Sequence, residues 1–92
     1  MDTQPLSLAA CKSGAAYRVV AIRGGPGLEL RLRQMGLSQG QTLRKRSGQF
    51  FRGPVVIRVQ STELAIGHRM ASHILVEPVH ETPGADRQPE RR

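Results

Sequence analysis

The segment around residues 54–66 constrains the fold most, because it predicts a β-hairpin. In "PVVIRV", residues 54–59, apolar side chains alternate with others, and this two-residue period is typical of a strand with one buried face. Gly53 and Pro54 fix where the strand begins. "TELAI", residues 62–66, follows after only two residues and predicts the returning strand. We therefore expect a mainly β, antiparallel protein.

Three further runs predict strands around this hairpin. "YRVVAIR", residues 17–23, is rich in β-branched residues and bounded by glycines, and "ILVEP", residues 74–78, is ended by its proline. "QTLRKRS", residues 41–47, is a weaker, basic strand with one clear apolar residue, Leu43, so one of its faces is expected to be exposed. Five short strands in so short a chain favour a partly open antiparallel barrel or a small sandwich.

One short helix is expected between Gly27 and Gly36. Three apolar residues there recur at i, i+4 and i+7, which places them on one helix face. Gly36 is suited to the left-handed conformation that ends a helix, and Leu37 beyond it can then contact the last turn. The core-facing residues are Leu28, Leu32 and Met35.

Two smaller helical turns are also expected. "GHRMASHI", residues 67–74, can form one to two turns, and Ser7 can cap a single turn near the N-terminus. The polar, proline-rich residues 80–92 are expected to be a disordered tail, and residues 1–5 a flexible N-terminus, around a domain at residues 6–79. The side chains expected to pack inward from the two turns are Leu6, Leu8, Met70 and Ile74.

Length and charge limit the class of protein. A chain of 92 residues can hold one small domain, and its net charge of +7 would attract nucleic acid, anionic lipid or an acidic protein face.

The single cysteine, Cys11, cannot form an internal disulfide, which fits a reducing cytoplasm. "LAAC" before it is similar to a lipoprotein cleavage box, but the basic start and apolar stretch of such a signal are missing. No run is long enough for a membrane span.

The glycine-rich bend "GGPG", residues 24–27, raises the question of a phosphate cradle before the short helix. The Lys-Ser/Thr pair of a P-loop and the G-x-G-x-x-G of a dinucleotide site are both missing, and Pro26 has no N–H to donate. We therefore favour a simple turn at this bend over a phosphate site.

Metal binding and catalysis receive little support from the sequence. His68 and His73 are five residues apart, about 140° around a helix, so they do not share a face as ligands would. Tertiary folding could still bring two ligands together, so the candidates stay open, and no metal site is assigned. No nucleophile and base can be paired, so we expect a protein that is not an enzyme and needs no cofactor. The candidate metal ligands are Cys11, His68, His73 and His80.

Positive charge is concentrated in the middle of the chain, on the helix and on the basic strand. Two phenylalanines lie beside it, too few aromatic residues for a typical stacking platform for nucleic acid. The expected partner-binding residues are Arg31, Arg33, Arg44, Lys45, Arg46, Phe50, Phe51 and Arg52.

Several segments in series resemble the ferrous iron transport protein A (FeoA) family. They are "LSLAACKSG", "YRVVAIRGGPGLELRLRQMGLSQGQTL", "GPVVIRV" and "ELAIGHRMASHILVE", within residues 6–77. The family often carries an apolar residue where this chain has Lys45, and a glycine near Gln60 and Ser61. The residues that match the family's structural motif are Gly24, Gly25, Gly27, Leu32, Met35, Gly36, Leu37, Gly53 and Pro54.

This resemblance implies a small SH3-like five-stranded antiparallel barrel with one or two short helices. It further implies a cytoplasmic accessory protein of ferrous iron uptake, associated with transition metal ion binding. The implied partner is the membrane ferrous iron permease with its cytosolic GTP-binding domain, which would bring the protein to the inner membrane. Two alternatives stay open, a basic barrel that binds nucleic acid and a binder of proline-rich peptides, and the sequence does not give the oligomeric state.

Overall fold

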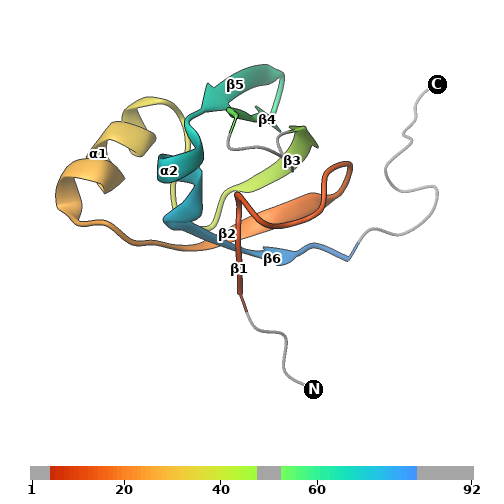
Figure 1. Ribbon diagram of the computed structural model, residues 1–92, viewed down its shortest axis with the longest axis horizontal. Helices are drawn as coiled ribbons and strands as arrows, with labels where there is room; N and C mark the ends of the chain where they lie inside the picture. The colour runs from red at the N-terminus through yellow and green to blue at the C-terminus, as the bar shows by residue number, and fades with distance from the viewer. Residues whose placement is uncertain (1–4, 48–52, 81–92) are drawn as a thin grey trace.

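The computed structural model describes residues 5–47 and 53–80 as one six-stranded antiparallel sheet with two short helices (Figure 1). The strand order is β1-β6-β2-β3-β4-β5. The predicted flexible N-terminus and disordered tail lie almost wholly outside the described residues and stay predictions. The elements are β1 (Leu6–Ser7), β2 (Ala16–Ile22), α1 (Pro26–Gln34), β3 (Thr42–Ser47), β4 (Val55–Val59), β5 (Thr62–Ile66), α2 (His68–Ser72) and β6 (Ile74–Pro78).

The mainly β, SH3-like fold class is confirmed. The barrel is not closed, in line with the predicted partly open barrel, and it has one more strand than predicted. β1 adds the sixth strand by pairing with β6, with Leu6 opposite Val76. A two-residue strand is too short to show the alternation of apolar and polar residues, so β1 could not be predicted from the sequence. Leu6, in this edge strand, is 41% exposed, so the prediction that it packs inward is wrong, whereas Leu8 is fully buried as predicted.

The core lies inside the curve of the sheet and is made almost entirely of aliphatic side chains. In Figure 1, β2 and β6 form one side of the molecule and the β4–β5 hairpin the other. Met70 of α2 is partly buried against the core and Ile74 is fully buried, as predicted. The buried cluster includes Leu8, Tyr17, Val19, Leu32, Leu37, Leu43, Val55, Ile57, Ile66 and Val76.

Helix α1 ends as the sequence predicts. Gly36 has φ +96° and donates its N–H to the Arg33 carbonyl at 3.0 Å, while Leu37 donates to the Leu32 carbonyl at 2.9 Å. These two bonds form a Schellman motif, which satisfies carbonyls that the helix end would leave without partners. Leu32 is fully buried, and Leu28 and Met35 are partly buried against the core. The predicted core-facing side of the helix is therefore confirmed.

The glycine bend turns the chain from β2 into α1. Gly24 and Gly25 both have left-handed φ, +102° and +96°, and Pro26 occupies the first position of the helix, where a missing N–H costs nothing. A Cβ at Gly24 would lie 2.8 Å from Cδ2 of Leu28. The turn is thus confirmed, and close packing against α1 is the reason for Gly24.

We predict opposite effects for two alanine substitutions within this bend. Gly24→Ala should lower the free energy of unfolding by about 1–3 kcal/mol, since it adds both backbone strain and a steric clash. Gly27→Ala, at a helical position with open space around the new Cβ, should raise it by up to about 1 kcal/mol. Urea unfolding of both variants tests this, and equal effects would contradict the packing role of Gly24.

The β4–β5 hairpin forms in the predicted register. Val59 lies opposite Thr62, so Gln60 and Ser61 form a two-residue turn. Gln60 takes φ +58°, a conformation that glycine adopts at lower cost, in keeping with the family's preference for glycine near this position. Leu64 and Ile66 face inward and Glu63 outward, as the alternation predicts.

Candidate functional site

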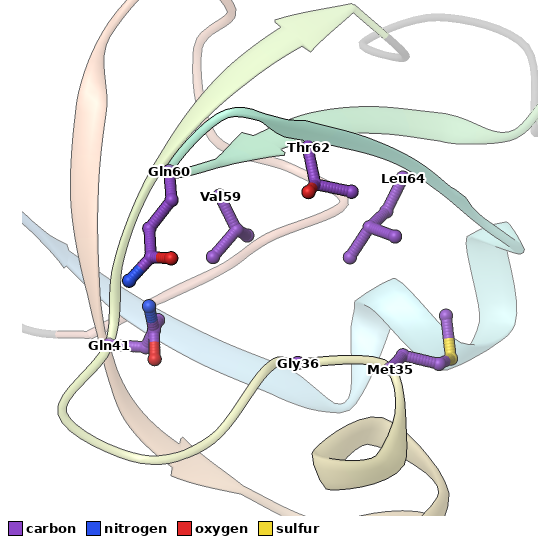
Figure 2. A pocket seen from close by; sticks show the side chains of 7 residues that line it. All are labelled: Met35, Gly36, Gln41, Val59, Gln60, Thr62 and Leu64. Carbon is purple, nitrogen blue, oxygen red and sulfur yellow. The ribbon is translucent and has the colours of Figure 1, made fainter.

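A groove lies between the end of α1 and the β4–β5 hairpin, which we call the helix–hairpin groove (Figure 2). Its volume is about 180 Å³. Met35 lies at one end, while the side chains of Gln41 and Gln60 point toward each other at the other end. The lining residues are Met35, Gly36, Gln41, Val59, Gln60, Thr62 and Leu64.

The helix–hairpin groove combines apolar and amide groups but holds no charged side chain. Gly36 lacks a side chain, so the end of α1 leaves space in front of the hairpin turn. Leu64 and Met35 are only partly buried against the core, which leaves apolar surface inside the groove. Such a lining suits a small apolar side chain with a polar group beside it, and not an ion.

A second candidate surface is the outer face of the sheet, opposite the core. β3 places Arg44 and Arg46 there, and two further arginines, Arg18 of β2 and Arg58 of β4, lie on the same side. We call these four residues the arginine face. Arg44 is directly opposite Arg58 in the β3–β4 ladder, and its Nη1 donates to the Gly14 carbonyl at 3.0 Å.

Two carboxylates accompany the arginine face. Glu63 Oε2 lies 3.5 Å from Nε of Arg46 and 3.8 Å from Nη1 of Arg58. Glu77 Oε2 accepts a hydrogen bond from Nη1 of Arg18 at 3.0 Å. All of these side chains are well exposed to water, so the pairs contribute little to stability.

The predicted partner-binding residues do not all come together. Arg31 and Arg33 are exposed on α1, where Arg33 lies 3.9 Å from Glu29, and Arg44 and Arg46 belong to the arginine face. Arg18 and Arg58 were missed, although the alternation of β4 already indicated that Arg58 points away from the core. What the sequence could not show is the register that sets Arg58 beside Arg44. The predictions for Phe50, Phe51 and Arg52 lie outside the described residues.

Lys45 is the one predicted contact residue that the structure contradicts. Its side chain is fully buried, so it cannot contribute to an exposed basic face. Nζ donates to the carbonyls of Cys11 at 2.6 Å and Ala9 at 3.3 Å. Its ammonium group thus ties the N-terminal turn to β3. The local pattern held a signal for this burial, because Lys45 lies two residues after the buried Leu43 and therefore on the same face of β3. Its carbonyl partners, more than 30 residues away in sequence, could not be predicted from that pattern.

Burial changes the titration of the groups around Lys45. Desolvation lowers the pKa of Lys45, with a smaller opposing effect of Cys11. Desolvation raises the pKa of the Cys11 thiol, and the neighbouring Lys45 charge opposes this in part. The pKa of Tyr17 is also raised by burial, and its hydroxyl donates to the Lys12 carbonyl at 2.8 Å. Cys11 is therefore a neutral, protected thiol rather than an activated one.

The four candidate metal ligands do not form a cluster of three or more in the described part of the chain. Across residues 5–47 and 53–80, no group of three or more His, Cys, Asp or Glu side chains could hold a metal ion. His73 follows the end of α2 beside Gly24, and His80 is exposed beyond β6. Nδ1 of His68 is buried and has no hydrogen-bond partner. In the same residue ranges, no helix has the length and apolar character needed to cross a membrane.

The chain is similar to known proteins in both sequence and structure. The family model for the FeoA domain matches residues 6–78. A crystal structure described as iron uptake regulatory protein (FeoA) is 29% identical, with a TM-score of 0.73, covering 83% of this chain and 99% of that one. The comparison with curated protein sequences gives no match.

Two more distant structures share the fold. The NMR structure of a FeoA-like protein from Clostridium acetobutylicum is 20% identical, covers 89% of this chain and 94% of that one, and has a TM-score of 0.73. A manganese-dependent transcriptional repressor in complex with manganese is 22% identical, with a TM-score of 0.75. The match covers 86% of this chain but only 39% of the repressor, so it concerns one part of that protein. The family match spans most of this chain, and the protein therefore belongs to the FeoA family, a membership that supports a role in ferrous iron transport.

Proposed function

We propose that this protein is a non-enzymatic, cytoplasmic accessory protein of ferrous iron uptake. It docks on the cytosolic GTP-binding domain of the membrane ferrous iron permease and regulates transport. The observation that carries this proposal is the FeoA family match over residues 6–78. FeoA is a family of small accessory domains and not a known family of enzymes.

The surfaces of the molecule support docking rather than chemistry. The helix–hairpin groove carries no titratable side chain, and the one described thiol, Cys11, is buried with a raised pKa. The arginine face and the exposed arginines of α1 offer charge for steering a partner that carries acidic groups. Binding of this kind is expected to weaken as salt concentration rises.

A pull-down with the permease's cytosolic domain tests the proposal. At moderate salt, we expect the domain to retain this protein, and the retained amount to change between GTP and GDP. Absence of binding with either nucleotide and without nucleotide would overturn the proposal. A mixed-sequence oligonucleotide in a parallel arm is expected to bind no better than the roughly 10⁻⁴ to 10⁻⁶ M of non-specific association.

A further inference from the structure

β5 lies at one edge of the sheet, and its outer side is open in the part of the chain that the structure describes. β4 is the one described strand that pairs with it, and neither helix of the described residues packs along it. Natural edge strands often carry proline, lysine or a bulge that prevents pairing with another chain. Thr62–Ile66 contains neither proline nor lysine, and its register with β4 shows no bulge. β5 can therefore accept a further strand.

The backbone groups that point away from β4 belong to Glu63 and Ala65. Val59 lies directly opposite Thr62 across a two-residue turn, and the closing pair of such a hairpin exchanges its N–H and C=O groups. Hydrogen-bonded pairs alternate along an antiparallel ladder, so Leu64 also bonds to β4. Glu63 and Ala65 direct their N–H and C=O groups outward instead, where they form a template for an incoming strand.

The helix–hairpin groove opens beside the same edge. Figure 2 shows β5 along one side of the groove and the segment from Met35 to Gln41 along the other. Thr62 and Leu64 of β5 line the groove, and every second side chain of an added strand would face it in the same way. The groove volume of about 180 Å³ is below the roughly 300–1,000 Å³ of a small-molecule site, but it suits one side chain. Backbone pairing and side-chain insertion can therefore occur together.

The net charge of the molecule distinguishes between two occupants of this edge, a second copy of the chain and another protein. The chain carries a net charge of +7, so two copies repel each other, whereas a segment with acidic residues is attracted. The groove is lined by no charged residue, so the side chain that enters it is apolar. The acidic residues of the partner then lie beyond the ends of the paired segment.

We infer that β5 pairs with an extended segment of the docking partner, with an apolar residue facing the helix–hairpin groove and acidic residues at its ends. The main-chain hydrogen bonds supply affinity, and the groove supplies selectivity for the inserted side chain. Gln41 and Gln60 point toward each other at one end of the groove, where their amides can bond to the backbone of the segment. The inference rests on the proposed docking function and specifies the edge that receives the partner.

Amide hydrogen exchange followed by NMR tests the pairing in the full chain. In the free protein, the amides of Glu63 and Ala65 should exchange about tenfold or more faster than that of Leu64, and equal protection would contradict the open edge. A saturating amount of the permease's cytosolic domain should slow both amides by about tenfold or more. The same is expected of a synthetic peptide in which Leu and Thr alternate over five residues, the length of β5, with glutamates at both ends.

Ala65→Pro separates pairing at the edge from all other contacts. Proline has no N–H, but the N–H of residue 65 points away from β4, so the β4–β5 ladder is kept. The variant should bind the domain and the peptide about tenfold or more weakly. The matched control Ala65→Thr keeps the N–H and should change the affinity less than about threefold.

A second pair of variants tests the groove. Thr62→Phe fills the helix–hairpin groove and should weaken binding by about tenfold or more. Thr42→Phe makes the same change on β3, outside this groove, and should change the affinity less than about threefold. The spectra of all four variants also report whether each remains folded.

Three outcomes would overturn the inference. The first is equal binding of the domain by Ala65→Pro and Ala65→Thr, which would leave the proposed function standing but place docking elsewhere. The second is protection of the Glu63 and Ala65 amides that rises with the concentration of the protein alone, which would make a second copy the occupant. The third is unchanged exchange with both the domain and the peptide. Protection by the peptide without any response to the domain would instead refute the proposed function and leave the pairing at β5 standing.

Discussion

Lys45→Ala is expected to lower the free energy of unfolding by about 2–4 kcal/mol, the largest effect we predict for a charged residue. The substitution removes a buried side chain and leaves the Ala9 and Cys11 carbonyls without the ammonium group that they accept hydrogen bonds from. Lys45→Met fills most of the same space but leaves the same two carbonyls unpaired, so it should lose about 1–2 kcal/mol, less than Lys45→Ala. Urea unfolding at neutral pH measures both.

The comparison between the two variants separates packing from charge. If Lys45→Met loses as much stability as Lys45→Ala, the hydrogen bonds of the ammonium group outweigh the packing of its alkyl chain, which would contradict our account. The FeoA family often carries an apolar residue at this position, which agrees with a role of the Lys45 alkyl chain in packing.

The pH dependence of stability gives a further test of Lys45. Because burial lowers its pKa, the folded protein binds fewer protons at this site than the unfolded chain. Its contribution to the unfolding free energy therefore rises with pH between the lowered pKa and the ordinary lysine value. The raised pKa values of Cys11 and Tyr17 act in the opposite direction at alkaline pH. Subtracting the curve of Lys45→Met from that of the wild type, from about pH 7 to about pH 10.5, should leave a difference that grows with pH.

Leu32→Ala is expected to lower the unfolding free energy by about 2–5 kcal/mol. Leu32 is fully buried, and its carbonyl accepts the Schellman bond from Leu37, so the cavity opens where α1 meets the core. Leu30 on the same helix is 50% exposed, and Leu30→Ala should change stability by no more than about 0.5 kcal/mol. Thermal unfolding of both variants checks the difference. Similar losses of stability in the two variants would mean that the packing of α1 does not depend on its buried face.

The local features of the fold could be predicted from sequence because each depends on neighbours in the chain. The alternation in β4, the two-residue turn at Gln60 and the end of α1 at Gly36 are each determined by a few neighbouring residues. β1 could not be predicted, since two residues show no period and their pairing with β6 spans almost the whole domain. The alternation in β3 places Lys45 on the same face as Leu43, but its charge led us to predict an exposed residue, because the carbonyls that accept its hydrogen bonds are distant in sequence.

The candidate site could be predicted only in part. The sequence predicted Arg44 and Arg46 as surface charges, and strand alternation correctly places them on the face of β3 opposite to Leu43. It did not show that Arg58 lies beside Arg44, because register between strands is a tertiary property. The helix–hairpin groove was not predicted either. Its two walls are the end of α1 and the β4–β5 hairpin, which are distant in sequence and meet only in the folded protein.

Titration of isotopically labelled protein with the permease's cytosolic domain, followed by NMR, tests the central claim most directly. The account predicts saturable shifts along β5 and around the end of α1, weaker in Ala65→Pro and dependent on whether GTP or GDP is present. Spectra that stay unchanged with the domain in every nucleotide state would contradict it.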